Sequence, residues 1–176
     1  MAINAYMLAL YEKHKPGGGK AVSFGYPSAH HDIKGDFKER MESDGFTVAV
    51  LDLFGEADIR FDLNQPNLLP RLADSFDLVI NPGTIEHCFH PGNALVNSLR
   101  MMKVGGVILH LGPLNRPKHG LWEARPQMYE KFYAENGCEV LHLDTDKAAR
   151  AHLYCVAQKH SEATLKLTYE AQYAAS

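Results

Sequence analysis

The amino-acid sequence predicts an α/β fold with a doubly wound, mostly parallel sheet that is closed by one antiparallel strand. Segments with a strand pattern alternate with segments with a helix pattern along most of the chain, which is typical of successive βαβ units. The strand segments are apolar on both faces, as strands are when helices cover both sides of a sheet. The last two strand segments are joined by the polar run TDKAAR, which is too short for a crossover helix, so these strands should be antiparallel.

The first half of the chain begins with a short amphipathic helix, expected over residues 2–14, and a flexible joint at KPGGGK, where Pro and Gly interrupt regular structure. Hydrophobic periodicity and turn residues predict the elements that follow. They are a strand over 21–24, a helix over 31–45 ended by Gly45, a strand over 46–54, a short strand over 57–63, and a helical turn or two over 67–75 interrupted by Pro70.

The second half continues the alternation. Its expected elements are a strand over 76–83, a helix over 91–106 with Pro91 in its first turn and Gly105 at its C-terminal cap, a strand over 106–114, a helix over 125–137, and closing strands over 138–146 and 151–159.

Length and composition favour one globular domain, since the chain has 176 residues, 45% hydrophobic and 22% charged. We divide it into an N-terminal helix and glycine joint (1–19), a main domain (20–160) and a C-terminal tail (161–176). A formal net charge of -3 gives no basic footprint for nucleic acid. The three cysteines form no CxxC pair, and neither a cationic leader nor a membrane segment is recognisable. We therefore expect a cytoplasmic protein.

The run FDLVINPGTIEHCFHPGNALVNSLRMMKVGGVILHLGPLN, residues 76–115, resembles the central segment of the class I S-adenosylmethionine-dependent methyltransferases. In that superfamily an FDxV strand leads to an EH pair, a helix ending in K-x-GG and a strand ending near a proline. The resemblance covers about Ala21 to Gln158 and implies a Rossmann-like sheet with a closing antiparallel strand. A second, shorter resemblance, carried by GTIEH and KHGLW, is to a branch of small bacterial methyltransferase-like proteins.

The resemblance implies S-adenosylmethionine as the cofactor and assigns two carboxylates to it. Asp52, at the end of the second strand, matches the acid that accepts hydrogen bonds from the ribose hydroxyls. Asp62 matches the position beside the adenine. An alternative stays open for each: Asp52 could only cap the next turn, and Asp62 could be a turn-forming residue before Asn64 and Pro66.

The turn after the first strand, in KAVSFGYPSAHHD, departs from the superfamily pattern. Ser23 stands where an acid is expected, Gly25 keeps the first glycine, and Pro27 and Ala29 replace the later two. Because proline fixes φ and lacks an N–H, this loop must take another path. We expect Ser23 and Gly25 to bind the cofactor weakly; the alternative is that Gly25 is an ordinary turn glycine.

The loop after the fourth strand, NPGTIEHCFHPGN, is expected to line the cleft for cofactor and acceptor. Asn81 and Glu86 are expected to bind the cofactor. His87, as a neutral imidazole near the sulfonium, is the candidate catalytic residue and would act as a general base. The Asn-Pro pair that opens the loop also half-matches the NPPY-type motif of amino methyltransferases.

His119 and Trp122 are expected on the acceptor side, where they could close over the acceptor; the alternative is an ordinary surface loop. Several metal-ligating side chains fall at predicted strand ends and could converge on one crevice. They are His30, His31, Asp32, Glu86, His87, His90, His110 and His119. Neither HHD nor EHCFH has the helical HExxH spacing, so no metal site is expected.

These observations lead us to expect an S-adenosylmethionine-dependent methyltransferase. A small-molecule acceptor is expected because no extra domain is present to recognise a polymer, and a homo-oligomer or partner protein could complete the site. The alternative is a non-catalytic protein of this fold that binds another ligand or a partner. A nicotinamide-dependent oxidoreductase would share the acid after the second strand but lacks GxGxxG.

Overall fold

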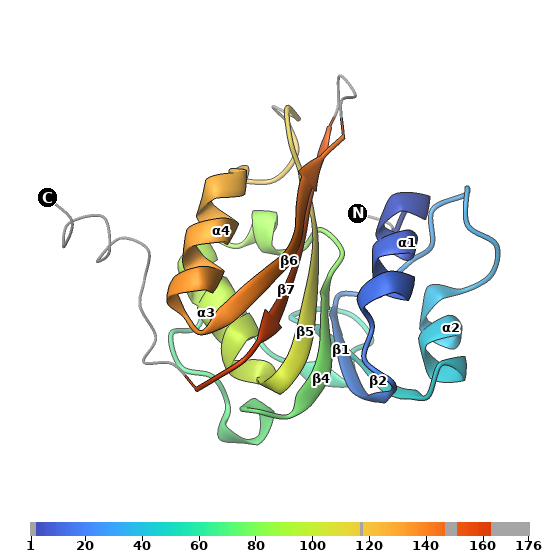
Figure 1. The fold of residues 1–176 in the computed structure, drawn as a ribbon, viewed down its shortest axis with the longest axis horizontal. Helices are drawn as coiled ribbons and strands as arrows, with labels where there is room; N and C mark the ends of the chain where they lie inside the picture. The colour runs from blue at the N-terminus through green and yellow to red at the C-terminus, as the bar shows by residue number, and fades with distance from the viewer. Residues whose placement is uncertain (1–2, 117, 147–150, 163–176) are drawn as a thin grey trace, which may run out of the picture.

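The computed structural model describes residues 3–116, 118–146 and 151–162. These residues form a seven-stranded sheet in the order β3-β2-β1-β4-β5-β7-β6. Helices α1 and α2 lie on one face of the sheet and α3 and α4 on the other (Figure 1). The predicted α/β sheet with helices on both faces is confirmed.

Seven strands, four α-helices and two short 3-10 helices (η) make up the described part of the chain. In chain order they are α1 (Ala5–His14), β1 (Gly19–Phe24), α2 (Phe37–Ser43), β2 (Phe46–Asp52), β3 (Ile59–Arg60), η1 (Pro70–Leu72), β4 (Phe76–Asn81), η2 (Ile85–His87), α3 (Pro91–Met101), β5 (Met102–Pro113), α4 (Pro126–Glu135), β6 (Cys138–Thr145) and β7 (His152–Lys159).

Strand pairing follows the expected pattern. β1 is parallel to both β2 and β4, and β4 is parallel to β5. β7 enters between β5 and β6 and is antiparallel to both, which confirms the closing antiparallel strand. Most of the connection between β6 and β7, residues 147–150, lies outside the described residues.

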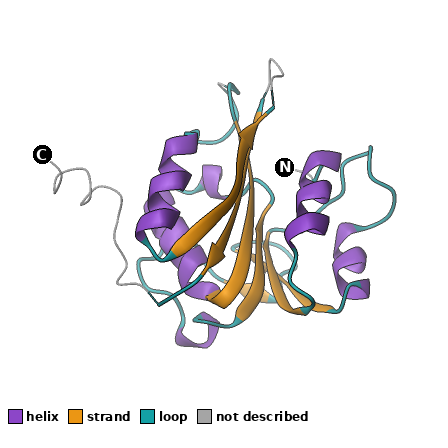
Figure 2. Cartoon of the chain, viewed as in Figure 1, coloured by secondary structure: helices purple, strands orange, loops and turns teal. Residues whose placement is uncertain are grey.

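The core has two layers, one on each face of the sheet. One cluster packs α3 and α4 against the sheet and includes the fully buried Val79, Ile108 and Tyr133. The other packs α1 and α2 against the opposite face and includes Met7, Phe37 and Ile80. The N-terminal helix therefore shares the core of the main domain. Loops connect the strands to the helices at both ends of the sheet (Figure 2).

The four predicted helices are all longer than the observed ones, and two of them differ most. The helix expected over 31–45 covers only Phe37–Ser43, because Asp36 is its N-cap and accepts from the Glu39 N–H at 3.0 Å. The helix expected over 91–106 ends at Met101, since Met102 already pairs with Phe76 as the first residue of β5. The predicted cap at Gly105 is therefore wrong, and Gly105 lies inside β5.

The region between β2 and β4 has less regular structure than expected. The strand predicted over 57–63 is the two-residue β3, and Pro70 begins η1 instead of interrupting a helix. Proline suits that position because the first N–H of a helix has no intrahelical acceptor. Within the described part of the chain, no helix has the length and apolar character needed to cross a membrane.

Candidate functional site

A pocket of about 180 Å³ opens at the carboxyl ends of β2 and β4, where ligands bind in open α/β sheets. Its walls combine apolar side chains with two carboxylates, an amide, a hydroxyl, an imidazole and a thiol. The lining residues are Leu51, Asp52, Leu53, Phe54, Phe61, Asp62, Leu63, Asn64, Thr84, His87 and Cys88. Three of the predicted site residues, Asp52, Asp62 and His87, therefore meet in one pocket.

Asp52 ends β2 and faces the tip of β1. One carboxylate oxygen, Oδ1, accepts from the Phe54 N–H at 3.2 Å, which is the turn-capping contact of the alternative interpretation. The other oxygen lies 3.7 Å from where a Cβ on Gly25 would be, with the Thr84 Oγ1 at 3.5 Å from the same point. Asp52 thus caps its turn through one oxygen and presents the other to the pocket beside Gly25.

Asp62, like Asp52, both stabilises a turn and lines the pocket. Its Oδ1 accepts from both the backbone N–H and the side-chain amide of Asn64, at 2.9 and 2.7 Å. Hydrogen bonds from Asn64 lower the pKa of this carboxyl, so Asp62 is ionised. The turn-forming role expected as the alternative is present, and the residue also lines the pocket.

The loop after β1 is fastened to the N-terminal segment. Residues Ser28 and His30 exchange backbone hydrogen bonds with Ile3, both at 2.8 Å, and Ile3 bridges Ala29. Gly25 has a φ of +76°, a region where a glycine is the least strained residue. The loop that contains Pro27 is therefore held by the N-terminal segment.

Ser23 lies beneath this loop. It is fully buried, and its hydroxyl donates to the Gly25 carbonyl at 2.8 Å. Ser23, which stands where the superfamily has an acid, thus stabilises the turn through its hydrogen bond to Gly25. It is not among the residues that line the pocket.

Asn81, the last residue of β4, organises the next loop. Its Oδ1 accepts from the N–H groups of Thr84 and Ile85 at 2.9 and 3.2 Å, and its Nδ2 lies 3.1 Å from the His110 Nδ1. Asn81 is 1% exposed, so these internal bonds are what its amide can reach. The structure places Asn81 under the pocket loop as a positioning residue.

His110 continues this buried network. Its Nε2 lies 2.5 Å from the Tyr133 hydroxyl, and its ring stacks on Tyr129 at a centroid distance of 4.7 Å. Complete burial lowers the pKa of His110 to about 3, so the imidazole is neutral. A neutral ring can accept from Asn81 at Nδ1 and donate to Tyr133 at Nε2.

Glu86, in η2 beside His87, is not among the residues that line the pocket. Its carboxylate is 4% exposed, and the Oε1 atom has no hydrogen-bond partner among the described residues. Burial raises the pKa of Glu86 to about 7. The His119 Nε2 is 3.6 Å away, and the His119 ring meets the His87 ring edge-on at 5.2 Å between centroids. Burial, and then His87, lower the pKa of His119.

The segment that contains His119 is held against η2 by backbone contacts. The Leu121 N–H donates to the Glu86 carbonyl at 2.8 Å, and the Trp122 indole N–H donates to the Ile85 carbonyl at 3.2 Å. A Cβ on Gly120 would lie 2.9 Å from the Glu86 carbonyl oxygen. The two short motifs GTIEH and KHGLW therefore meet in space, and Trp122 fastens them together.

The other histidines expected near strand ends do not join this group. His30 pairs with Asp32 at 2.9 Å in an exposed position, beside the His31 ring. His90 is exposed at the start of α3. Of the eight side chains named from the sequence, the structure brings together Glu86, His87 and His119.

Sequence reasoning missed Thr84 as a pocket residue. Its hydroxyl donates to the Phe24 carbonyl at 2.6 Å and so ties the loop after β4 to the end of β1. The available signal was Asn81 at the start of this turn, because Asn side chains commonly accept from nearby backbone N–H groups in turns.

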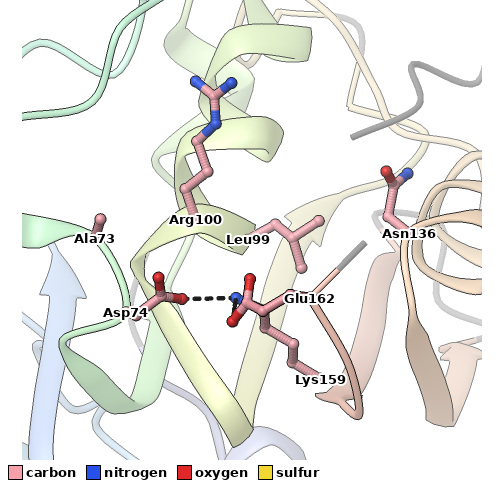
Figure 3. A pocket seen from close by; sticks show the side chains of 7 residues that line it. All are labelled: Ala73, Asp74, Leu99, Arg100, Asn136, Lys159 and Glu162. Carbon is pink, nitrogen blue, oxygen red and sulfur yellow. Dashed lines mark hydrogen bonds and ion pairs between the residues drawn. The ribbon is translucent and has the colours of Figure 1, made fainter. Parts of the chain in front are cut away.

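A second cavity, of about 240 Å³, lies at the opposite end of the sheet (Figure 3). Its only buried charge is Lys159, whose Nζ contacts Asp74 at 2.8 Å, Glu162 at 3.1 Å and the Met102 carbonyl at 2.9 Å. Because this ammonium is fully paired within the chain, the cavity has the character of a structural ion-pair site.

Solved structures with the same fold are mostly S-adenosylmethionine-dependent methyltransferases. A methyltransferase from Mesorhizobium loti is 14% identical with a TM-score of 0.64, covering 88% of this chain and 98% of its own. The [4+2]-cyclase SpnF is also 14% identical, with a TM-score of 0.65 and coverages of 88% and 80%.

A phosphoethanolamine-type N-methyltransferase from Haemonchus contortus, solved with S-adenosylhomocysteine, is 13% identical with a TM-score of 0.60 and coverages of 88% and 52%. No family model and no curated protein matches the chain. At these identities the comparisons establish the fold: the chain has the class I methyltransferase fold, as its sequence resemblance implied.

Proposed function

We propose that this protein binds S-adenosylmethionine in the pocket beside Asp52 and transfers its methyl group to a small-molecule acceptor. The observation that supports this most strongly is that Asp52 and Asp62 line one pocket at the carboxyl ends of β2 and β4, in a fold shared with methyltransferases. One solved protein of this fold holds S-adenosylhomocysteine. The cofactor would supply an electrophilic methyl group on a sulfonium.

The pocket residues fit the parts of such a cofactor. The free oxygen of Asp52 can accept from ribose hydroxyls, and charge-assisted bonds of this kind are about twice as strong as neutral ones. Phe61 and Leu63 offer apolar walls for an adenine ring, with Asp62 at its edge. Gly25, with no side chain, leaves space between Asp52 and Thr84.

His87 is the proposed general base. Its side chain lines the pocket proposed for the cofactor, and its ring also contacts the ring of His119 on the proposed acceptor side. Methyl transfer is a displacement that depends mainly on alignment, and good alignment can lower a barrier by roughly 7–11 kcal/mol. A base is needed only where the acceptor must lose a proton. The acceptor side is proposed at Glu86 and His119, with Trp122 holding that segment in place.

Calorimetric titration with S-adenosylmethionine and S-adenosylhomocysteine tests this proposal. We expect the native chain to bind in the micromolar range or more weakly, about -8 kcal/mol or less favourable. Asp52→Ala should weaken binding by about 1.5–3 kcal/mol, the contribution of a charge-assisted hydrogen bond. Glu56→Ala is the matched control, because it removes the same charge from an exposed residue outside the pocket lining.

Equal affinity in the folded Asp52→Ala variant would remove Asp52 from the site. No binding by the native chain would favour the second candidate, a protein of this fold that does not transfer methyl groups. Two observations favour that candidate: the loop after β1 is tied to Ile3, and SpnF, which has the same fold, is a cyclase by name. A cytoplasmic location and a homo-oligomer or partner protein stay predictions.

A further inference from the structure

We propose that Glu86, His87 and His119 form a binding site for a divalent transition-metal ion of the zinc type. One ligand atom from each residue, a carboxylate oxygen and two imidazole nitrogens, lies within 4.8 Å of the others. The three residues come from η2 and from the segment before α4, which are far apart in sequence. The proposal concerns metal binding alone and stands whether or not the chain transfers methyl groups.

The spacing of two of these atoms matches ligands of a shared ion. The Glu86 Oε1 and the His119 Nε2 are 3.6 Å apart, which is too long for a hydrogen bond. Two ligands about 2.1 Å from a tetrahedral zinc ion lie about 3.4 Å from each other. The observed separation therefore leaves room for an ion between the two atoms.

Burial gives the second, independent observation. The Glu86 carboxylate is 4% exposed, and its Oε1 and the His119 Nε2 both have no hydrogen-bond partner among the described residues. Buried charges in proteins are normally paired or coordinate metals. The Arg116 guanidinium, whose charge also acts on Glu86, directs its Nη2 to the His152 ring, and no ion pair joins Arg116 to Glu86 among the described residues.

The backbone holds the site together without help from the ligand side chains. The Leu121 N–H donates to the carbonyl of Glu86 itself, and Gly120 permits this close approach. The ligands are therefore on two segments whose separation is fixed before any ion arrives, which favours binding.

The donor set selects the class of ion. Two imidazoles and one carboxylate suit Zn²⁺, Co²⁺ or Fe²⁺, whereas Mg²⁺ and Ca²⁺ prefer oxygen ligands alone. Three protein ligands leave at least one coordination position for water or another small ligand. His87 is exposed, so the cluster can be reached from solvent.

The test uses the full chain without a metal-binding tag, stripped with EDTA and then titrated with Zn²⁺ by calorimetry. We expect one Zn²⁺ per chain. Glu86→Gln and His119→Gln should each weaken binding by more than about 100-fold, because changes to outer-shell partners alone cost about 10–100-fold. His90→Gln, an exposed histidine of the same region outside the cluster, should leave affinity unchanged.

Two further measurements keep the result decisive if a variant fails to fold. The Tm of the native chain should rise with Zn²⁺ and not with Mg²⁺, and Co²⁺ should give the visible absorption of a four- or five-coordinate site with nitrogen ligands. The rival explanation is a direct Glu86–His119 ion pair, which predicts no Zn²⁺-dependent change in Tm. No stoichiometric Zn²⁺ binding by the native chain, or equal loss in His90→Gln, would overturn the proposal.

Discussion

The loops after β1 and after β4 lie at the same edge of the sheet but use their polar groups differently. The loop after β1 bonds to Ile3 through its backbone, and its exposed Tyr26 donates to Asp36 at 2.7 Å. The loop after β4 is held by hydrogen bonds to Asn81, and the buried Oε1 of Glu86 in this loop has no hydrogen-bond partner among the described residues. Polar groups that a chain satisfies internally support structure, whereas a buried group left unsatisfied is a candidate position for a water, an ion or a ligand.

The largest loss of stability is expected from a substitution of Asn81, which holds the loop after β4. Asn81→Ala leaves two backbone N–H groups without their acceptor and breaks the contact to His110, so it should lower the free energy of unfolding by about 3 kcal/mol. Urea denaturation measures the loss. Asn93→Ala, which removes one bond to the Asn64 carbonyl, should cost about 1 kcal/mol; equal losses would mean that Asn81 does not organise the loop.

The loop after β1 can be tested at its one retained glycine. A side chain on Gly25 would meet Thr84 and Asp52 and would be strained at a φ of +76°. Gly25→Val should therefore reduce S-adenosylmethionine affinity by about 100-fold or more, equivalent to about 2.7 kcal/mol, while the sheet stays folded by circular dichroism. Gly17→Ala, with nothing within 4 Å of the added atom, is the control. Unchanged affinity in Gly25→Val would show that this turn does not contact the ligand.

The network under the loop after β4 also predicts a pH dependence of stability. The unfolded chain protonates His110 near its ordinary pKa of about 6.5, whereas burial lowers the pKa of the folded state to about 3. The unfolded state thus binds more protons below pH 6.5, and stability falls as pH falls, by about 2 kcal/mol between pH 6.5 and 5.

His110→Gln should remove this part of the slope, since glutamine does not titrate. His90→Gln, at an exposed position, should retain the native slope. Urea midpoints measured across this pH range make the comparison, and parallel slopes in all three proteins would contradict the buried, neutral state of His110.

The smallest effect is expected from restoring the glycine pattern. Pro27→Gly with Ala29→Gly gives the unfolded chain more conformational freedom, so it should destabilise the protein by about 1–2 kcal/mol. Because backbone bonds to Ile3 still set the path of the loop, affinity for S-adenosylmethionine should change by less than about threefold. A tenfold gain in affinity for S-adenosylmethionine would contradict this expectation and would mean that the two glycines alone restore a binding loop.

The order of strands was predictable because each apolar run is long and bounded by turn residues. Helix ends were less predictable: the boundary at Met101 depends on pairing between Met102 and Phe76, which a local pattern does not contain. Asp52 and Asp62 were predictable from their positions after strands. The meeting of Glu86 with His119 was not, because it depends on how the segment before α4 folds back on η2.

The hydrogen bond from the Asn4 side chain to the Tyr154 hydroxyl, 2.8 Å long, joins residues 150 positions apart. During synthesis, therefore, α1 leaves the ribosome long before its partner on β7 exists. Contacts of such high sequence separation slow folding, since a long loop must close before they form. Tyr11, on the apolar face of α1, packs against Phe37 of α2 and can do so early, whereas the polar contact at Asn4 must wait until β7 inserts beside β5. Insertion of β7, the last described strand in chain order, would then complete the contacts of the N-terminal helix.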